Sequence, residues 1–303
     1  MSHPKRVRFY LNDGTRRRAR NGEHNFIAKI VHVLERTGYE ISYHANTMVE
    51  RLKAGTRRGY ALCEMTPPPN KRAMTFRRVY HYPFWQIQAS DKRWEWDVAQ
   101  ARFDPLACPQ KDARRFFSYW QARICGPLLD HVGDDDFIYV PLQGRLTDHR
   151  SFQSCSPIDM LVQTRAACPG KRIIATLHPK ETYSPDEMTA LNEVQRRDPD
   201  LSIQTGGRDA LLPRCSYIVT MTSSVAFDGM FFGKPAIAFG QTDFHHVMLD
   251  GQDPDAFDRI QSHRPDYAAY LWWVWQHMAI NGGHGSAEAK IAEKLSAAGW
   301  PIE

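Results

Sequence analysis

Two adjacent serines stand between apolar segments in the C-terminal half of the chain, where they could bind an anion. The stretch "YIVTMTSSVAFDGMFFGKPAIAFG" (217–240) predicts a buried strand, a helix that begins near Ser223 and Ser224, and a second strand. A serine before a helix can cap it, and the first backbone N–H groups of a helix attract phosphate. Ordinary capping explains the same two hydroxyls, so this segment alone leaves both interpretations open.

A histidine occupies a similar place in "LHPKE" (177–181), which follows another apolar segment. His178 could donate a hydrogen bond to a phosphate or act as an acid toward a leaving group. Pro179 disfavours helical backbone just before it, which ends the preceding element. An isolated His-Pro pair also occurs at ordinary surface positions, where Lys180 and its neighbours would simply be solvated.

A third polar segment, "PLQGRLTDHRSFQS" (141–154), follows an apolar run and contains Asp148 and His149. A carboxylate there could serve as general base if it came within hydrogen-bond reach of a substrate hydroxyl. The three consecutive aspartates at 134–136 are a rival source of a carboxylate. Their position at a polar break is more typical of a solvated linker.

The elements that must position these residues alternate between strand and helix. This alternation predicts parallel strands joined by crossover helices, a doubly wound sheet, whose strands all present their carboxyl ends at one edge. The three polar segments therefore converge on that edge. The predicted strands and helices are, in chain order, 137–143, 156–167 (helix), 172–179, 185–197 (helix), 201–204, 207–213 (helix), 217–221, 223–232 (helix) and 236–240.

The N-terminal half also begins as strand, helix and strand, which is typical of an α/β domain. We expect an irregular, aromatic-rich stretch at 71–110, either packed beneath a long loop or forming a wall that binds an acceptor sugar. We place the domain boundary at the polar break, giving an N-terminal domain 1–132 and a C-terminal domain 133–303, whose last helices could pack back on the first. The other predicted elements are a strand 6–11, a basic loop to residue 25, a helix within 26–37, strands 39–44 and 59–65, and a helix within 113–132.

Composition bounds the class of protein. The 303 residues are 42% hydrophobic and 24% charged, and the net charge is +5, which fits a globular enzyme of anionic substrates or one lying on an anionic membrane. No nucleic-acid-binding signature is present, six cysteines form no CxxC pair, and His245-His246 lacks further ligands, so we predict no nucleic-acid partner and no metal. Without a signal peptide or an apolar run of about 20 residues, we expect a cytoplasmic protein, compatible with peripheral contact with the inner membrane.

In this order, "VPLQ" (140–143), Asp148, "LHPKE" (177–181) and the segment 217–240 resemble the capsular polysaccharide biosynthesis family, which includes the Kdo transferases of capsule assembly. The resemblance covers about residues 137–246. It implies a GT-B fold: two Rossmann-like, doubly wound domains facing across a cleft, with the donor nucleotide held mainly by the C-terminal domain. It also implies metal-independent transfer of Kdo or a related sugar from a CMP-sugar to a glycan or lipid-linked acceptor, with no cofactor besides the donor.

The resemblance extends to individual residues. Bacterial sialyltransferases of GT-B type similarly combine a His-Pro with a serine pair, so His178 would contact the CMP phosphate and the serines would hold it from the helix end. Asp228 stands where the family more often has glutamate, and this shorter side chain weakens a contact with a ribose hydroxyl. The predicted catalytic residues are Asp148 and His178, and the predicted donor-binding residues are Gln143, His178, Pro179, Lys180, Thr222, Ser223, Ser224 and Asp228.

Two other functions fit the same sequence features. A nucleotide-sugar epimerase of GT-B shape would need the same phosphate site but no acceptor. A non-catalytic protein of capsule assembly or glycan binding could retain the fold without turnover. Nucleotide binding separates the last of these from the two enzymes.

Overall fold

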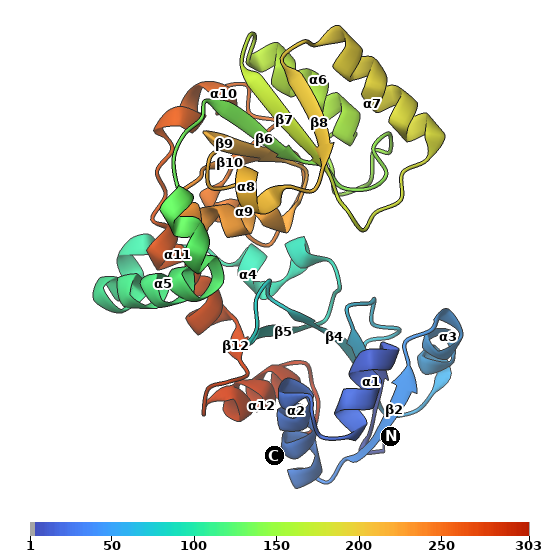
Figure 1. Ribbon diagram of the computed structural model, residues 1–303. Coiled ribbons are helices and arrows are strands. Elements are labelled where there is room, and N and C mark those ends of the chain that lie inside the picture. Colours follow the sequence, from blue (N-terminus) through green and yellow to red (C-terminus); the bar gives the residue numbers. More distant parts are fainter. Residues whose placement is uncertain (1–3, 303) are drawn as a thin grey trace. The chain divides into compact units, whose positions relative to one another are not determined.

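The computed structural model describes residues 4–302, and the chain divides into two compact units. Unit 1 comprises Met1–Ala101 and Trp273–Glu303, and unit 2 comprises Arg102–Trp272. Within the described residues, each unit contains one six-stranded sheet accompanied by helices (Figure 1). Both units are therefore α/β, as the alternating sequence pattern predicted.

The sheet of unit 1 is mostly parallel, with strand order β12-β5-β4-β3-β1-β2. Strands β1, β2, β3 and β4 pair with one another in parallel, whereas β5 is antiparallel to both β4 and β12. The three strands that the sequence predicted in this half correspond to β1, β2 and β3. The bounds are β1 Arg6–Leu11, β2 Glu40–Ala45, β3 Tyr60–Glu64, β4 Ala73–Arg78, β5 Phe84–Gln88 and β12 Ile280–Asn281.

Helix α2 (Asn25–Arg36) packs against α12 (Ala287–Ala297), which comes from the far end of the chain. The ring of His24 caps α2 by accepting a hydrogen bond from Ile27 N–H. The two helices share one core with the sheet and with Trp300. Its helical members are Phe26, Ile27, Ile30, Val33 and Leu34 from α2 and Ala287, Ile291 and Leu295 from α12. The remaining helices of unit 1 are α1 Asp13–Arg20, α3 Met48–Thr56, η1 Arg93–Glu95, α4 Asp97–Gln100 and the π-helix η7 Trp273–Met278.

Two expectations for unit 1 are wrong. The basic segment after β1 is not a loop but helix α1, which buries Thr15 and Ala19 at helical spacing behind its arginines. The aromatic stretch is not a long loop, because it contains β4 and β5. Trp85 of β5 stacks on Phe26 with ring centroids 4.8 Å apart, so aromatic packing against the sheet, rather than exposure, accounts for this ring.

The sheet of unit 2 is parallel between all neighbours, in the order β11-β10-β9-β6-β7-β8. The chain adds β7 and then β8 on one side of β6, and afterwards returns to add β9, β10 and β11 on the other side. This confirms the doubly wound sheet that the sequence predicted. The strands are β6 Phe137–Pro141, β7 Arg172–Leu177, β8 Leu201–Thr205, β9 Tyr217–Thr220, β10 Ala236–Ala238 and β11 Leu249–Asp250.

Local sequence signals explain the long helices of unit 2. Ser156 and Ser184 each begin a helix with a complete capping box, formed with Asp159 and Glu187, and proline follows each serine. No helix among residues 4–302 is both long and apolar enough to cross a bilayer. The helices are η2 Pro105–Ala107, α5 Gln110–Cys125, η3 Gly126–His131, α6 Pro157–Ala167, α7 Pro185–Arg197, α8 Arg208–Leu211, α9 Ser224–Gly229, η4 Met230–Phe232, η5 His245–Val247, α10 Ala256–Arg259, η6 Ile260–Ser262 and α11 Tyr267–Trp272.

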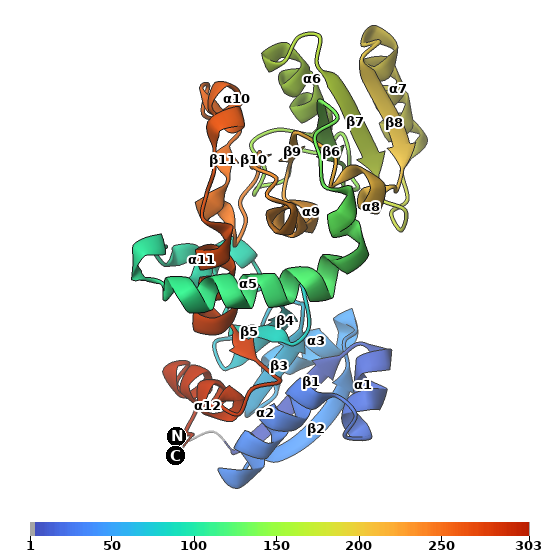
Figure 2. The same cartoon turned by 60° about the vertical axis from the view of Figure 1, so that its left-hand side comes forward.

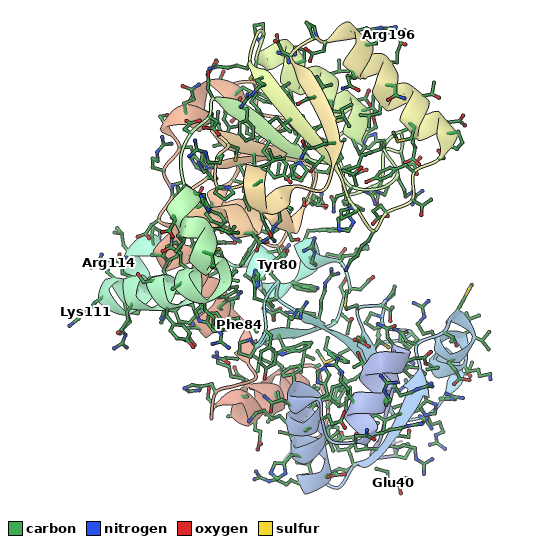
Figure 3. All side chains as sticks on the ribbon, viewed as in Figure 1. Glu40, Tyr80, Phe84, Lys111, Arg114 and Arg196 are labelled. Atoms are coloured by element: carbon green, nitrogen blue, oxygen red, sulfur yellow. The ribbon has the colours of Figure 1, made fainter. Side chains whose placement is uncertain are left out.

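The expected boundary at 132/133 falls inside unit 2, because α5 belongs to this unit. Helix α5 lies against α11 (Figure 2). The Gln121 side chain of α5 donates a hydrogen bond to the Phe231 carbonyl oxygen at 2.5 Å. Lys111 and Arg114 lie on the outward side of α5 (Figure 3). The acidic break that suggested a linker is likewise tied to unit 2, since Asp135 accepts hydrogen bonds from Arg214.

The C-terminal helix provides a test of how unit 1 is held together. Replacing the fully buried Ile291 by alanine leaves a cavity between α12 and α2, so we expect the free energy of unfolding to fall by about 2–5 kcal/mol. Glu293→Ala changes an exposed residue of the same helix and should alter it by less than about 0.5 kcal/mol. Urea denaturation monitored by circular dichroism gives both values, and equal stabilities of the two variants would contradict this packing.

Candidate functional site

The order of strands in unit 2 defines where a ligand can bind. Loops that leave β6 toward β7 and loops that leave β9 toward β10 diverge to opposite sides, which opens a crevice at the carboxyl ends of the strands. A cavity of about 790 Å³ lies there, lined by residues that follow or end β6, β7, β8 and β9. Its polar lining consists of Gln143, Thr176, His178, Glu181, Arg208, Asp209, Ser223, Ser224 and Asp228, together with Tyr139.

The structure brings most of the predicted site residues to this cavity. Thr222 is linked to it, because its hydroxyl donates a hydrogen bond to Gln143 Oε1 at 3.1 Å. Among the described residues, Lys180 and Asp148 lie outside the cavity lining, and the Asp148 carboxylate pairs with Arg145 at 2.6 Å. The roles assigned to all the predicted site residues, inside or outside the lining, stay predictions. The predicted residues that line the cavity are Gln143, His178, Pro179, Ser223, Ser224 and Asp228.

The His178 ring is oriented by its own loop. Its Nδ1 accepts a hydrogen bond from the Lys180 N–H at 3.2 Å, so the neutral ring carries its proton on Nε2. The His178 backbone N–H donates to the Tyr183 hydroxyl at 2.8 Å, which fixes the start of the same loop. The cavity is thus lined by an imidazole whose remaining ring N–H can donate to an anion.

The two serines differ in position: one caps helix α9 and the other is exposed at the cavity. Ser223 is the N-cap of α9: its Oγ accepts from Val225 N–H at 3.3 Å, and its own N–H donates to Thr220 Oγ1 at 3.2 Å. Ser223 is buried and still has a hydroxyl hydrogen to donate, whereas Ser224 is exposed at the cavity wall. Ser224 is therefore the hydroxyl that a ligand reaches most directly.

Arg208 is a cavity residue that the sequence analysis missed. It begins α8 directly after Gly206 and Gly207, whose φ angles are +71° and +83°. Side chains rarely adopt such positive φ angles, so this turn at the end of β8 favours glycine at both positions. A glycine pair followed by arginine at a predicted strand end was the signal available in the sequence.

The Arg208 side chain is held between two carboxylates. Its Nη1 donates to Asp228 Oδ2 at 2.6 Å and its Nε donates to Asp209 Oδ1 at 2.9 Å. Burial lowers the pKa of Arg208, but the two carboxylates more than offset this effect and leave that pKa above its ordinary value. Asp228 therefore fixes a permanent cation in the cavity wall, and a contact of Asp228 with a ribose hydroxyl would have to coexist with this pair.

Glu181 supplies another carboxylate to the cavity, from the loop that carries His178. It lies against the loop after β6, where a Cβ on Gly144 would come within 2.7 Å of Glu181 Oε2. The two aspartates of the cavity lining, Asp209 and Asp228, both accept hydrogen bonds from Arg208. Glu181 lies on a different loop, beside Gly144. The sequence analysis had treated this residue only as part of the motif around His178.

The paired histidines that we weighed as metal ligands form a different contact. His245 and His246 stack with ring centroids 4.1 Å apart, and the latter meets the Tyr270 hydroxyl through Nδ1 at 3.2 Å. Among residues 4–302, no group of three or more histidine, cysteine, aspartate or glutamate side chains is arranged to hold a metal ion.

Comparison with known proteins supports the same architecture. The sequence matches no family model and no curated protein. Among solved structures, the chain is similar to the KpsC beta Kdo 2,7 transferase of Thermosulfurimonas dismutans, with a TM-score of 0.52 and 14% sequence identity over 96% of this chain and 98% of that one. The chain has the GT-B fold.

Weaker similarities extend to other proteins. The KpsC beta Kdo 2,4 transferase of the same organism gives a TM-score of 0.44 at 10% identity, covering 89% of this chain and 90% of that one. UDP-GlcNAc 2-epimerase from Neisseria meningitidis bound to UDP-GlcNAc gives 0.37 at 10% identity, covering 96% and 99%. The GT-B assignment rests on the 2,7 transferase and on the two sheets described above, and it confirms the fold that the sequence resemblance implied.

The Arg208–Asp228 pair yields a prediction about stability. Asp228→Asn leaves a half-buried guanidinium without its closest carboxylate, and we expect the free energy of unfolding to fall by about 1–2 kcal/mol. This value is reduced because the Arg208 side chain is 40% exposed, although that of Asp228 is only 9% exposed. Asp209→Asn removes the more exposed partner and should have a much smaller effect. Urea denaturation of the two variants compares them, and equal losses would contradict the assignment.

Proposed function

We propose that the chain is a glycosyltransferase of capsular or other surface polysaccharide synthesis that binds the nucleotide of an activated sugar in the cavity of unit 2. The donor we propose is CMP-Kdo or a related CMP-sugar, and the acceptor is a glycan or a lipid-linked glycan. The donor serves as the co-substrate, without a metal ion. The observation that carries this proposal is the convergence of His178, Ser224 and Arg208 on one cavity at the strand-order reversal of a GT-B unit.

The size and chemistry of the cavity support a nucleotide as ligand. Its volume of about 790 Å³ lies in the range of roughly 300–1,000 Å³ that small-molecule sites occupy. His178 Nε2–H, the Ser224 hydroxyl and the Arg208 guanidinium are all donors suited to phosphate oxygens. Tyr139 and Leu142 from the end of β6 add apolar surface at the same wall.

These donors also suit the chemistry of glycosyl transfer. The bond between the anomeric carbon of the sugar and a phosphate oxygen breaks, and negative charge builds up on the departing nucleotide phosphate. Donors that are fixed before the reaction stabilise this charge more than they stabilise the intact donor, which lowers the barrier. The acceptor hydroxyl forms the new bond to the anomeric carbon and gives its proton to a carboxylate.

Glu181 and Asp148 are the two candidates for the carboxylate that accepts this proton. Asp148 is the residue that the family resemblance indicates, and it pairs with Arg145 outside the cavity lining. Glu181 lines the cavity beside His178, and this position favours it.

Nucleotide binding tests the proposal directly. We expect wild-type protein to bind CMP more tightly than UDP or GDP in calorimetric titrations. His178→Ala, and Ser223→Ala with Ser224→Ala, should each weaken CMP binding by about tenfold or more, since each removes a donor to a charged phosphate. His131→Ala changes an exposed histidine of η3 outside the cavity and should bind CMP as the wild type does.

The result of the nucleotide titrations distinguishes the proposed function from the alternatives. Wild-type protein that binds none of the three nucleotides would overturn the donor site and favour a non-catalytic protein. Preference for UDP or GDP would replace the CMP-sugar while keeping a nucleotide-sugar enzyme. Turnover of a nucleotide sugar without any acceptor would identify an epimerase instead of a transferase.

The choice of base can be tested separately. We expect Glu181→Gln to lower kcat by about 10²–10⁴-fold while leaving CMP affinity nearly unchanged, because the amide cannot accept the acceptor proton. Asp148→Asn is the matched change at the other candidate. A large loss of kcat for Asp148→Asn alone would assign the base to Asp148 and contradict the assignment to Glu181.

A further inference from the structure

Helix α3 of unit 1 exposes large apolar side chains to solvent. Met48, Val49 and Leu52 are 70%, 59% and 67% exposed. Met48 and Leu52 are four residues apart and so lie on the same side of the helix, with Val49 beside them. Ala54, the buried residue of α3, lies on the opposite side and faces the core formed with Tyr10 and its neighbours. The helix therefore turns its apolar side away from the unit.

The proline segment after β3 widens this surface. A cavity of about 350 Å³ lies between α3 and Pro67–Pro69, lined by Met48, Leu52, Arg51 and Gly55. Asn70 fastens the segment to the end of the helix, because its side-chain amide donates to the Ala54 carbonyl oxygen at 3.4 Å. We call the surface made by Met48, Val49, Arg51, Leu52 and Pro67–Pro69 the α3 surface.

Positive charge surrounds these apolar side chains. The segment 48–58 contains four basic residues and one acidic residue, Glu50, so its net charge is +3. Glu50 pairs with Lys53 at 3.0 Å and with Arg57 at 2.9 Å, so the one carboxylate is shared between two cations. The Nε of Arg51 is buried at the cavity and finds no hydrogen-bond partner among residues 4–302.

More arginines gather at the adjacent end of β2. Burial lowers the pKa of His44, and the nearby charges of Arg57, Arg8 and Arg20 lower that pKa further against the opposing effect of Glu50. Arg20 also donates to the Tyr43 carbonyl oxygen at 3.3 Å, which holds its side chain beside this strand end. A cluster of cations thus borders the helix that begins at Met48.

We propose that the α3 surface is where the chain binds an anionic phospholipid bilayer. A short amphipathic helix with exposed methionine, valine and leucine beside arginines and lysine matches the interfacial helices that insert their apolar side between headgroups. The surrounding cations complement the negative charge of such a leaflet, where each contributes additional attraction. Charge complementarity therefore selects an anionic membrane from among the occupants an exposed apolar patch could have.

This inference concerns unit 1 and does not depend on the donor or on catalysis. Helix α1 is also rich in arginine, but its Arg16 pairs with Asp13 and the helix is not part of the α3 surface. Binding to lipid can therefore be measured without any sugar, and its failure would leave the nucleotide site of unit 2 untouched.

The experiment uses the full chain and vesicles of defined composition. Co-sedimentation is measured with pure phosphatidylcholine vesicles and with vesicles containing phosphatidylglycerol and cardiolipin. We expect binding to the anionic vesicles alone, and a steep decrease as salt rises, because the cations are screened. Met48→Asp with Leu52→Asp should weaken it at least about tenfold, through lost apolar burial and added negative charge.

A matched control separates this surface from a general effect of charge. Leu106→Asp with Val162→Asp adds the same two charges at apolar residues of unit 2 that are 88% and 49% exposed, and should change binding by less than about twofold. Arg51→Gln with Arg58→Gln keeps the apolar residues and should weaken binding to anionic vesicles by about tenfold. Circular dichroism verifies that each variant is folded.

Three results would overturn the proposal. Equal binding to both kinds of vesicle would show that charge does not select the membrane. Undiminished binding by the folded Met48→Asp/Leu52→Asp variant would show that α3 is not the binding surface. Concentration-dependent self-association of the wild type, lost in the same variant while lipid binding is absent, would assign the surface to a second copy of the chain.

Discussion

The position of β6 between β7 and β9 is the constraint on which the candidate site depends. Because crossover connections in parallel sheets keep one hand, strands added on opposite sides of β6 carry their helices to opposite faces. The loops on either side of β6 must then separate, and the carboxyl edge of the sheet is left hollow there. Residues as far apart in sequence as Gln143 and Asp228 line one cavity for this reason.

The polar residues that line this cavity are held in place by contacts within the protein. Ser223 caps α9, the Gly206–Gly207 turn precedes α8, and Arg208 is paired with Asp228, so the positions of these cavity residues are set by contacts within the protein. Such pre-organisation reduces the free energy spent on ordering side chains when a ligand binds. The same contacts that looked like ordinary capping in the sequence therefore contribute to the candidate site.

Sequence reasoning succeeded where periodicity and strand ends carry the information. The alternation after residue 137 predicted every crossover up to β10, and three of the loops that meet at the cavity followed from it. The fourth, with Arg208, was missed although its strand was predicted, because the motifs that drew attention to the other three loops have no counterpart after β8. Helix α1 was missed because arginines on its outer side hide the spacing of Thr15 and Ala19, and the side-chain surroundings of Asp148 depend on a neighbour, Arg145, that no pattern reveals.

Unit 2 is one continuous stretch of chain, whereas unit 1 is divided between the two ends. During synthesis on the ribosome, the partners of β5 and α2, namely β12 and α12, emerge only after the whole of unit 2. The apolar side of α2, with Phe26 and Leu34, therefore lacks its cover from α12 until Ala287–Ala297 has been made, after the whole of unit 2. Folding during synthesis would thus complete the sheet of unit 2 before the sheet of unit 1, although the first strand of unit 1 is translated earlier.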